Sequence, residues 1–226
     1  MEMTAMDTAR FEAMRHAMVA SQLRTNAVSD PRIVAVMARV PREAFLPADV
    51  RGIAYRDTAV PLGRGRFQNV PIATGRLLTE AYLLPADRVL LIGAAGGYTA
   101  AVLAGLVGEV VAVESDPTLA ALAREALAGY PNVTLVEGPL EAGHAPSDHG
   151  GAAYDVLMID GSVEHVPDAL VAQLVTGGRA VAGIADRGIT RLASGRKTAG
   201  GFALLDFADI DCVSLPGFAR PKTFTF

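Results

Sequence analysis

The residues best suited to chemistry are a run of small residues and one acid in the middle of the chain. The run from Gly93 to Gly97 reads Gly-Ala-Ala-Gly-Gly and directly follows an apolar segment. Glycines at a strand-to-helix turn let the backbone approach a ligand closely. A second apolar segment ends in Glu114, 21 positions after Gly93, where a carboxylate can accept both hydroxyl protons of a ribose. The pair predicts a nucleoside site, against the plainer alternatives of a tight turn and a solvated acid.

The loop also narrows the class of cofactor. The dinucleotide fingerprint expects its third glycine where this chain has Tyr98, and Gly97 comes one residue early. No Gly-Lys-Ser or Gly-Lys-Thr follows, so the signature of a triphosphate site is missing. S-adenosylmethionine has a ribose and no pyrophosphate, which suits a small-residue loop with a ribose acid. Methyl transfer is therefore the predicted reaction, and a dehydrogenase is disfavoured.

Alternating strands and helices must position this loop. Five apolar runs are predicted as strands and the amphipathic stretches between them as helices. The predicted strands are 88–92, 109–113, 133–136, 154–159 and 179–184, and the predicted helices are 74–83, 99–106, 119–128 and 166–174. This alternation predicts an α/β fold with a Rossmann-like, mostly parallel sheet. Three later runs, at 189–194, 202–207 and 222–226, predict an antiparallel C-terminal edge.

The first 73 residues follow another pattern. Apolar residues at helical spacing predict a helix over 12–23, and Ser29-Asp30-Pro31 predicts the start of a second helix, which contains Ile33 to Met37. The sequence Gly-Arg-Gly-Arg from Gly63 predicts an irregular loop. We find no repeat and no linker. The chain is therefore predicted to be one domain, 1–226, with a helical extension and substrate loop at 1–73 and a Rossmann-like core at 74–226.

Composition excludes several classes of protein. The chain has 226 residues, 51% of them hydrophobic, and a net charge of −4, which excludes a disulfide miniprotein, a disordered chain and a strongly basic nucleic-acid surface. Its one cysteine, Cys212, is expected to be a half-buried free thiol in a reducing compartment. The N-terminal residues lack the apolar core of a signal peptide, and the most apolar stretch, 99–113, is too short to span a bilayer. We expect a soluble cytoplasmic protein with no metal, nucleic-acid or membrane site, and the sequence leaves its oligomeric state open.

Several segments match one known family. They are Gln22-Leu23-Arg24, Asp30-Pro31-Arg32, the run from Val40 to Pro47 (Val-Pro-Arg-Glu-Ala-Phe-Leu-Pro), Ala54-Tyr55, Pro61-Leu62-Gly63 and the run from Ile92 to Ala104. On these segments the chain resembles the protein-L-isoaspartate O-methyltransferases, well over residues 10–185 and more loosely beyond. The resemblance implies S-adenosylmethionine as methyl donor. It also implies transfer of the methyl group to the carboxylate of an isoaspartyl residue in damaged protein, a repair reaction.

The resemblance and the sheet edge together predict the site. The predicted cofactor-binding residues lie on the glycine loop and at strand ends: Gly93, Ala94, Ala95, Gly97, Glu114, Ser115, Pro139, Leu140 and Asp160. The predicted substrate-binding residues are Phe67, Asn69 and Pro71. For Asp160 a helix cap is an equally good reading. No catalytic side chain is assigned, because an ionised carboxylate and a sulfonium need positioning more than acid–base help.

Departures from the family affect the expected substrate. The family's substrate loop reads about Gly-x-Thr-x-Ser-x-Pro, and here Phe67 and Asn69 replace both hydroxyl residues. The Asn69 amide could donate an equivalent hydrogen bond, or Asn69 could simply be a turn residue. Leu91 and Pro139 replace two acids near the cofactor loop. We therefore expect weakened activity on a protein or peptide carboxylate. Two alternatives stay open: a non-catalytic S-adenosylmethionine-binding protein and a methyltransferase for another acid. Arg64 and Arg66 could attract an acidic substrate or be merely solvated.

Overall fold

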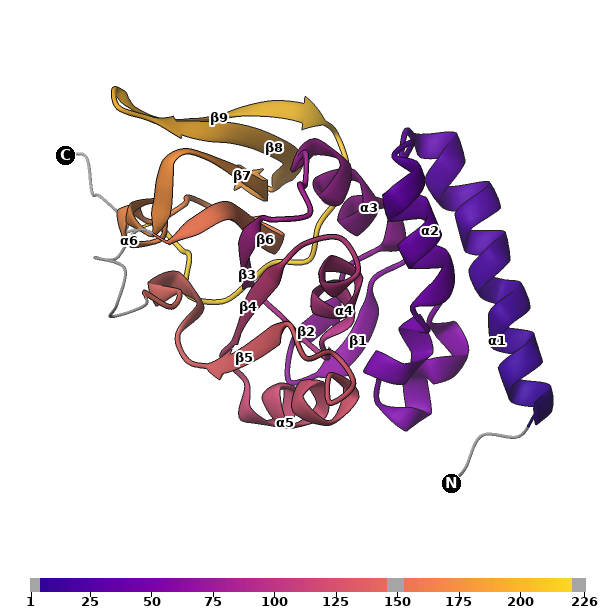
Figure 1. Cartoon of the computed structure of the whole chain (residues 1–226). Helices are drawn as coiled ribbons and strands as arrows, with labels where there is room; N and C mark the ends of the chain where they lie inside the picture. The colour runs from indigo at the N-terminus through magenta and orange to yellow at the C-terminus, as the bar shows by residue number, and fades with distance from the viewer. Residues whose placement is uncertain (1–4, 146–152, 221–226) are drawn as a thin grey trace.

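The computed structural model describes residues 5–145 and 153–220 of the chain. Within these ranges seven strands form one sheet in the order β5-β4-β3-β6-β7-β8-β9 (Figure 1). They are β3 (Arg88–Ile92), β4 (Glu109–Glu114), β5 (Val133–Glu137), β6 (Tyr154–Val163), β7 (Leu174–Asp186), β8 (Ile189–Thr198) and β9 (Gly201–Ala208). The pairs from β5 to β7 are parallel, and β8 and β9 are each antiparallel to their neighbours. The predicted fold class is confirmed.

Alternation along the central strand β3 separates two hydrophobic cores. Val89 and Leu91 belong to one core, and Leu90 and Ile92 belong to the other, because successive side chains of a strand point to opposite faces. Three helices, α3 (Pro71–Glu80), α4 (Tyr98–Ala104) and α5 (Pro117–Ala126), contribute to the first core. The short helix α6 (Asp168–Ala172) and the chain at Phe218 contribute to the second. Covering on both faces explains why β3 is almost uninterruptedly apolar.

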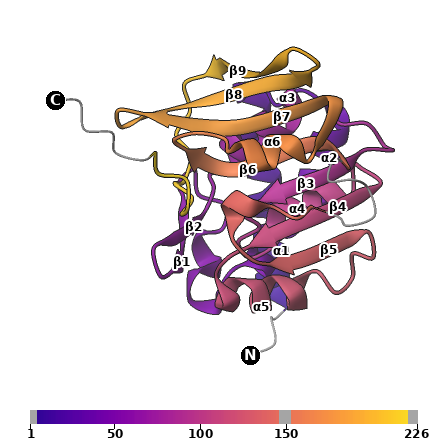
Figure 2. The ribbon, with the colours of Figure 1, turned by 90° about the vertical axis from the view of Figure 1, so that its left-hand side faces the viewer.

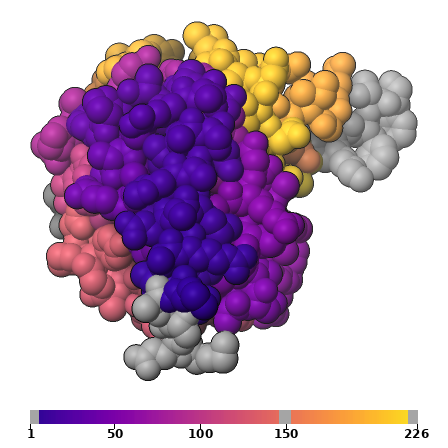
Figure 3. Space-filling view, turned by 90° about the vertical axis from the view of Figure 1, so that its right-hand side faces the viewer, coloured from indigo at the N-terminus to yellow at the C-terminus, as the bar shows by residue number. Residues whose placement is uncertain are grey.

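The N-terminal extension packs on the first core. It comprises α1 (Ala5–Met18), the π-helical turn η1 (Val19–Leu23), η2 (Arg24–Asn26), α2 (Pro31–Arg39), η3 (Arg42–Phe45) and η4 (Ala48–Ile53). In Figure 3 this indigo and violet segment covers most of one face of the molecule. The first helix starts earlier than the sequence predicts and changes to π geometry at Val19. The second begins as predicted, with Asp30 as N-cap and Pro31 in the first turn.

The segment predicted as an irregular loop is instead a β-hairpin, so that prediction is wrong. Strand β1 (Val60–Gly63) pairs antiparallel with β2 (Arg66–Gln68). The two residues between them, Arg64 and Gly65, have φ of 51° and 75°, and positive φ at both positions is what a tight hairpin turn of type I′ requires. Figure 2 shows the hairpin at one end of the large sheet, next to the yellow C-terminal chain.

Other differences concern element bounds. Strand β6 continues through Val163, because Ser162 and Val163 pair with β7 and Ser162 also bridges to Ser214. Helix α6, at Asp168–Ala172, is shorter than the predicted 166–174, and β7 already begins at Leu174. The strand predicted at 222–226 lies outside the described residues. No helix in the described part of the chain combines the length and the apolar character needed to cross a membrane.

Candidate cofactor and substrate site

The glycine loop lies between β3 and α4 and is tied to the neighbouring strand. The backbone N–H groups of Gly93 and Ala94 donate to the carbonyl oxygen of Val113, at 3.1 and 3.0 Å. Gly93 has φ of 84°, and a Cβ there would lie 2.9 Å from the Leu215 side chain. A Cβ on Gly96 would collide with the backbone carbonyl of Phe45. Gly96 therefore requires glycine because the Phe45 backbone approaches the loop closely, and Gly93 favours glycine because of its positive φ.

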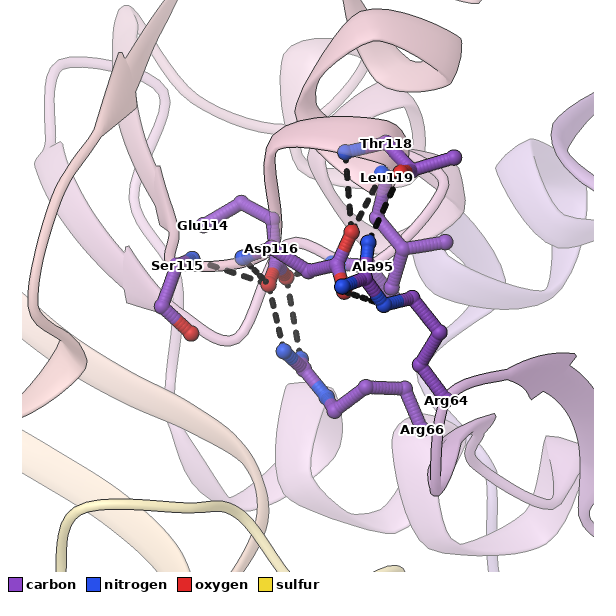
Figure 4. Close-up of polar contacts among 8 residues, drawn as sticks. All are labelled: Arg64, Arg66, Ala95, Glu114, Ser115, Asp116, Thr118 and Leu119. Atoms are coloured by element: carbon purple, nitrogen blue, oxygen red, sulfur yellow. Dashed lines mark hydrogen bonds and ion pairs between the residues drawn. The ribbon is translucent and has the colours of Figure 1, made fainter.

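Glu114 ends β4 beside this loop, as the sequence predicts, and its carboxylate is fully buried (Figure 4). Three backbone N–H groups donate to it: those of Ala95 at 2.7 Å, Ser115 at 2.8 Å and Asp116 at 2.9 Å. Backbone donors of this kind fix the direction of a carboxylate. Glu114 is therefore not a solvated strand end.

The strand β2 supplies the other partner of this carboxylate. Arg66 forms a two-pronged ion pair with Glu114, through Nη1 to Oε1 and through Nη2 to Oε2 at 2.9 Å, and Arg66 is 6% exposed (Figure 4). With three backbone donors and this fork, the acceptor sites of the carboxylate are all taken. A ribose diol would present the same pattern, one donor for each carboxylate oxygen. The residues fit a nucleoside chemically, and the Arg66 side chain must leave for one to bind.

A small cavity separates the glycine loop from β2. Six predicted site residues line it together with Gln68, Gly96, Tyr98 and Thr99: Phe67, Asn69, Gly93, Ala94, Ala95 and Asp160. Its volume is about 10 Å³, roughly enough for one water molecule. The cavity is therefore too small for a nucleoside in this arrangement of the hairpin.

Asp160 connects the walls of this cavity. It lies inside β6 and accepts hydrogen bonds from the Asn69 amide at 3.1 Å, the Thr74 hydroxyl at 3.2 Å and the Thr99 hydroxyl. These three donors come from the hairpin segment, α3 and α4. The alternative of a helix cap is wrong, because β6 continues past Asp160 and the donors to its carboxylate are side chains.

Asn69 is committed to structural contacts. Its Nδ2 donates to Asp160 and to the Cys212 sulfur at 3.6 Å, and its Oδ1 accepts from the backbone N–H of Val213 at 3.2 Å. Asn69 thereby ties the hairpin to the C-terminal segment. As Asp160 takes one amide proton, only the weakly bound proton on Cys212 could turn to an acceptor carboxylate.

A groove of about 530 Å³ opens on the other side of Asn69. Its lining residues come from the hairpin segment and the C-terminal chain: Thr58, Ala59, Gly65, Phe67, Asn69, Val70, Asp211, Cys212, Val213 and Ser214. The Phe67 ring is 42% exposed and contributes to this wall. Pro71, the third predicted substrate residue, is the buried first residue of α3 and does not line the groove. Burial raises the pKa of the Cys212 thiol to about 12.

The remaining predicted residues lie apart from the small cavity. Gly97 faces α5, where an added Cβ would meet Leu127 at 3.0 Å. Ser115 lines an open depression together with both arginines of the hairpin. Pro139 and the buried Leu140 form the start of a 3₁₀ turn after β5.

The structure separates the two arginines that the sequence treats alike, and it adds one candidate residue that the sequence analysis missed. Arg64 is largely exposed, with its Nε 3.7 Å from Asp116, whereas Arg66 is buried and paired, so solvation describes only the first. The candidate that sequence reasoning missed is Gln68, which is 5% exposed and lines the cavity. The alternation of β2 carried the signal, because Arg66 and Gln68 share its buried face.

The fold and this site define a class of protein: a Rossmann-like methyltransferase, with a glycine loop and a ribose-type acid at the carboxyl edge of the sheet. The family model for protein-L-isoaspartate(D-aspartate) O-methyltransferase matches residues 14–215. The chain belongs to this family, and the predictions of an S-adenosylmethionine-dependent O-methyltransferase and of its cofactor are confirmed.

Individual relatives agree. A protein-L-isoaspartate O-methyltransferase 1 of Rhodopseudomonas palustris (strain HaA2) is 40% identical over 189 residues, which are 82% of this chain and 76% of that protein. One from Koribacter versatilis is 35% identical over 213 residues, covering 93% and 94% of the two chains.

Two solved structures share the fold. A protein-L-isoaspartate O-methyltransferase superposes with a TM-score of 0.77 at 24% identity, over 90% of this chain and 66% of the other. A second, from Plasmodium falciparum in complex with S-adenosyl-L-homocysteine, gives a TM-score of 0.73 at 18% identity, over 89% and 97%.

Proposed function

We propose that this chain methylates the free carboxylate of isoaspartyl residues in damaged proteins or peptides, in the cytoplasm. The observation that carries the proposal is the groove of about 530 Å³ between the hairpin segment and residues 211–214. It shares Asn69 and Phe67 with the cavity at the glycine loop. An acceptor in the groove and a donor at the loop would therefore meet at β2, the geometry that in-line methyl transfer needs.

The chain's own residues have distinct tasks in this proposal. S-adenosylmethionine supplies the activated methyl group. Glu114, once Arg66 has left it, would accept the ribose hydroxyl protons, and the glycine loop would allow close approach of the backbone. Asp160 holds Asn69, Thr74 and Thr99 in place. Most of the groove lining is apolar or uncharged, and Asp211 is its one charged member. This composition supports an extended peptide as acceptor and offers no basic surface to a nucleic acid.

The missing hydroxyls lower the expected rate. Phe67 brings no donor, and one Asn69 amide proton is held by Asp160. Loss of a donor aimed at a reacting group costs roughly 10²–10³ in rate when charge develops there. In this reaction the carboxylate loses charge, so we expect a smaller loss, expressed in alignment and KM.

The test compares wild type, Phe67→Thr and the double variant Phe67→Thr, Asn69→Ser on an isoaspartyl peptide. Phe67→Thr is the cleaner variant, because Phe67 is 42% exposed, whereas Asn69→Ser also cuts the tie to Val213. We expect slow methylation by wild type and an increase with Phe67→Thr. If wild type binds S-adenosylhomocysteine but methylates no isoaspartyl peptide, the proposal that isoaspartyl residues are the substrate is refuted.

A further inference from the structure

The side chain of Gln68 has an arrangement that folding alone does not explain. It lies on the buried face of β2, between the outward-facing Phe67 and the tied Asn69. Gln68 is 5% exposed, yet neither Nε2 nor Oε1 has a hydrogen-bond partner. A buried amide without partners lowers the stability of the fold, since its bonds to water are lost and not replaced. Such a group is expected to have a partner in another state of the protein.

The surroundings of this amide indicate the partner. Gln68 lines the small cavity together with the glycine loop, Tyr98 and Asp160. The Tyr98 side chain is also buried there, with the Arg42 guanidinium 4.8 Å from its ring centroid. The Asp160 carboxylate accepts from Asn69, Thr74 and Thr99 and not from Gln68. The unsatisfied polar group on which the inference rests is therefore the neutral amide of Gln68.

We propose that the Gln68 amide binds the α-amino-acid end of the cofactor, with Oε1 accepting from its ammonium group and Nε2 donating to its carboxylate. The inference rests on S-adenosylmethionine being the cofactor. A primary amide offers one acceptor and two donors in a fixed plane, which matches a zwitterion without adding a buried charge. The Asp160 carboxylate on the same cavity favours the ammonium side. On the same strand face, Arg66 occupies the ribose acid, so β2 would contribute to both ends of the cofactor site.

The test separates the amino-acid end from the nucleoside. S-adenosylhomocysteine carries that end, and 5′-methylthioadenosine lacks it. The variant Gln68→Met keeps the length of the side chain. We expect it to lower the affinity for S-adenosylhomocysteine by about 10- to 100-fold in calorimetric titration, the range for a lost hydrogen bond to a charged group. Affinity for 5′-methylthioadenosine should stay within about twofold of wild type. Without ligand, the melting temperature should be unchanged or higher, because an unpaired amide has been removed.

Gln22→Met is the matched control. The Gln22 amide donates to the carbonyl of Tyr55 at 2.9 Å, far from the cavity in sequence. This variant should lower the melting temperature and leave the ratio of the two affinities unchanged.

Three outcomes would overturn the inference. Gln68→Met could lower the affinities for the two ligands equally, or lower neither, which would show that the amide does not contact the amino-acid end. The unliganded variant could melt as far below wild type as Gln22→Met does, which would show that a bound water or another group already satisfies the amide. Wild type could bind neither compound, which would refute the cofactor and the inference together.

Discussion

At the scale of single residues, Arg66 occupies the carboxylate of Glu114, which we propose as the ribose acid of the cofactor site. The carboxylate is fully buried and holds five hydrogen bonds, two of them from the guanidinium. Breaking a buried ion pair by removing one partner typically costs about 3–5 kcal/mol. In the proposed site, a ribose on Glu114 would have to replace Arg66, so the measured affinity would be the intrinsic affinity reduced by the fraction of molecules in which the pair is formed.

Arg66→Gln should therefore have opposite effects on binding and on stability. We expect S-adenosylhomocysteine to bind on the order of tenfold more tightly, because the competitor for Glu114 is gone. The free protein should lose about 3 kcal/mol of unfolding free energy. Titration calorimetry and urea unfolding measure the two effects. Arg64→Gln, at the exposed neighbour, should change neither. Weaker binding by Arg66→Gln would mean that Arg66 contacts the cofactor directly.

The Cys212 thiol gives a prediction with a defined pH dependence. Burial is the main cause that raises its pKa from 9.0 to about 12, and the Asn69 hydrogen bond opposes the shift. Since the folded protein favours the protonated thiol, the thiolate is scarce at pH 8 and its population grows only as pH rises toward 12. We expect alkylation by iodoacetamide at pH 8 to be at least a hundredfold slower than for an exposed cysteine. The rate should still be rising above pH 10. A plateau near pH 9 would contradict the burial of this thiol.

At the scale of elements, the sequence predicted those strands, turns and caps that depend on residues close together in the chain. The strands β3 and β4, the loop between β3 and α4 and the Asp30 cap all follow from apolar runs, glycines and a Ser-Asp-Pro sequence. The hairpin was missed because Arg64 adopts a positive φ that its residue type disfavours. The role of Arg66 was missed because its partner is 48 positions away. Likewise, nothing local to Asn69 shows that it binds Val213.

The cap of α2 is testable at this scale. The Asp30 carboxylate accepts from the Arg32 backbone N–H at 2.8 Å and from its guanidinium, and the side-chain hydrogen bond of Arg32 is the main cause that lowers the pKa of Asp30. Asp30→Ala should cost about 1 kcal/mol of unfolding free energy at pH 7. Because the folded pKa is depressed, the contribution is complete above the ordinary Asp range and disappears as pH falls through the folded value. Urea unfolding at pH 7 and pH 2.5 should show the gap between variant and wild type closing. Asp49→Ala, at an exposed position, should have the same unfolding free energy as wild type at both pH values.

At the scale of the whole molecule, the extension and the sheet share one core. Residues from α1 through α2 belong to the same hydrophobic cluster as β3, β4 and the glycine-loop alanines. The fully buried Arg42 joins the two parts: its side chain donates to the carbonyls of Ala54 and Asn69 and lies 4.8 Å from the Tyr98 ring centroid. Removing the extension would leave this apolar surface and the glycine loop uncovered.

We therefore expect one cooperative unfolding transition for the full chain. In scanning calorimetry the calorimetric and van't Hoff enthalpies should agree. A chain that starts at residue 74 should fail to give a cooperative transition, because the apolar surface of α3 and α4 on which the extension packs becomes exposed. Two separate transitions in the full chain, or a folded truncated core, would contradict the prediction of a single domain.

The C-terminal segment that closes the site also sets when the site can exist during protein synthesis. The Val213 carbonyl accepts from Ser162 at 2.7 Å, its N–H donates to Asn69, and Leu215 lies against Gly93 and Gly161. All other walls of the groove and cavity precede this segment in the chain and leave the ribosome first. A nascent chain whose residues 211–215 are still inside the exit tunnel has the glycine loop and the hairpin but lacks this wall. The groove is thus completed only after every strand of the sheet has been made, and the growing polypeptide cannot hold an acceptor before then.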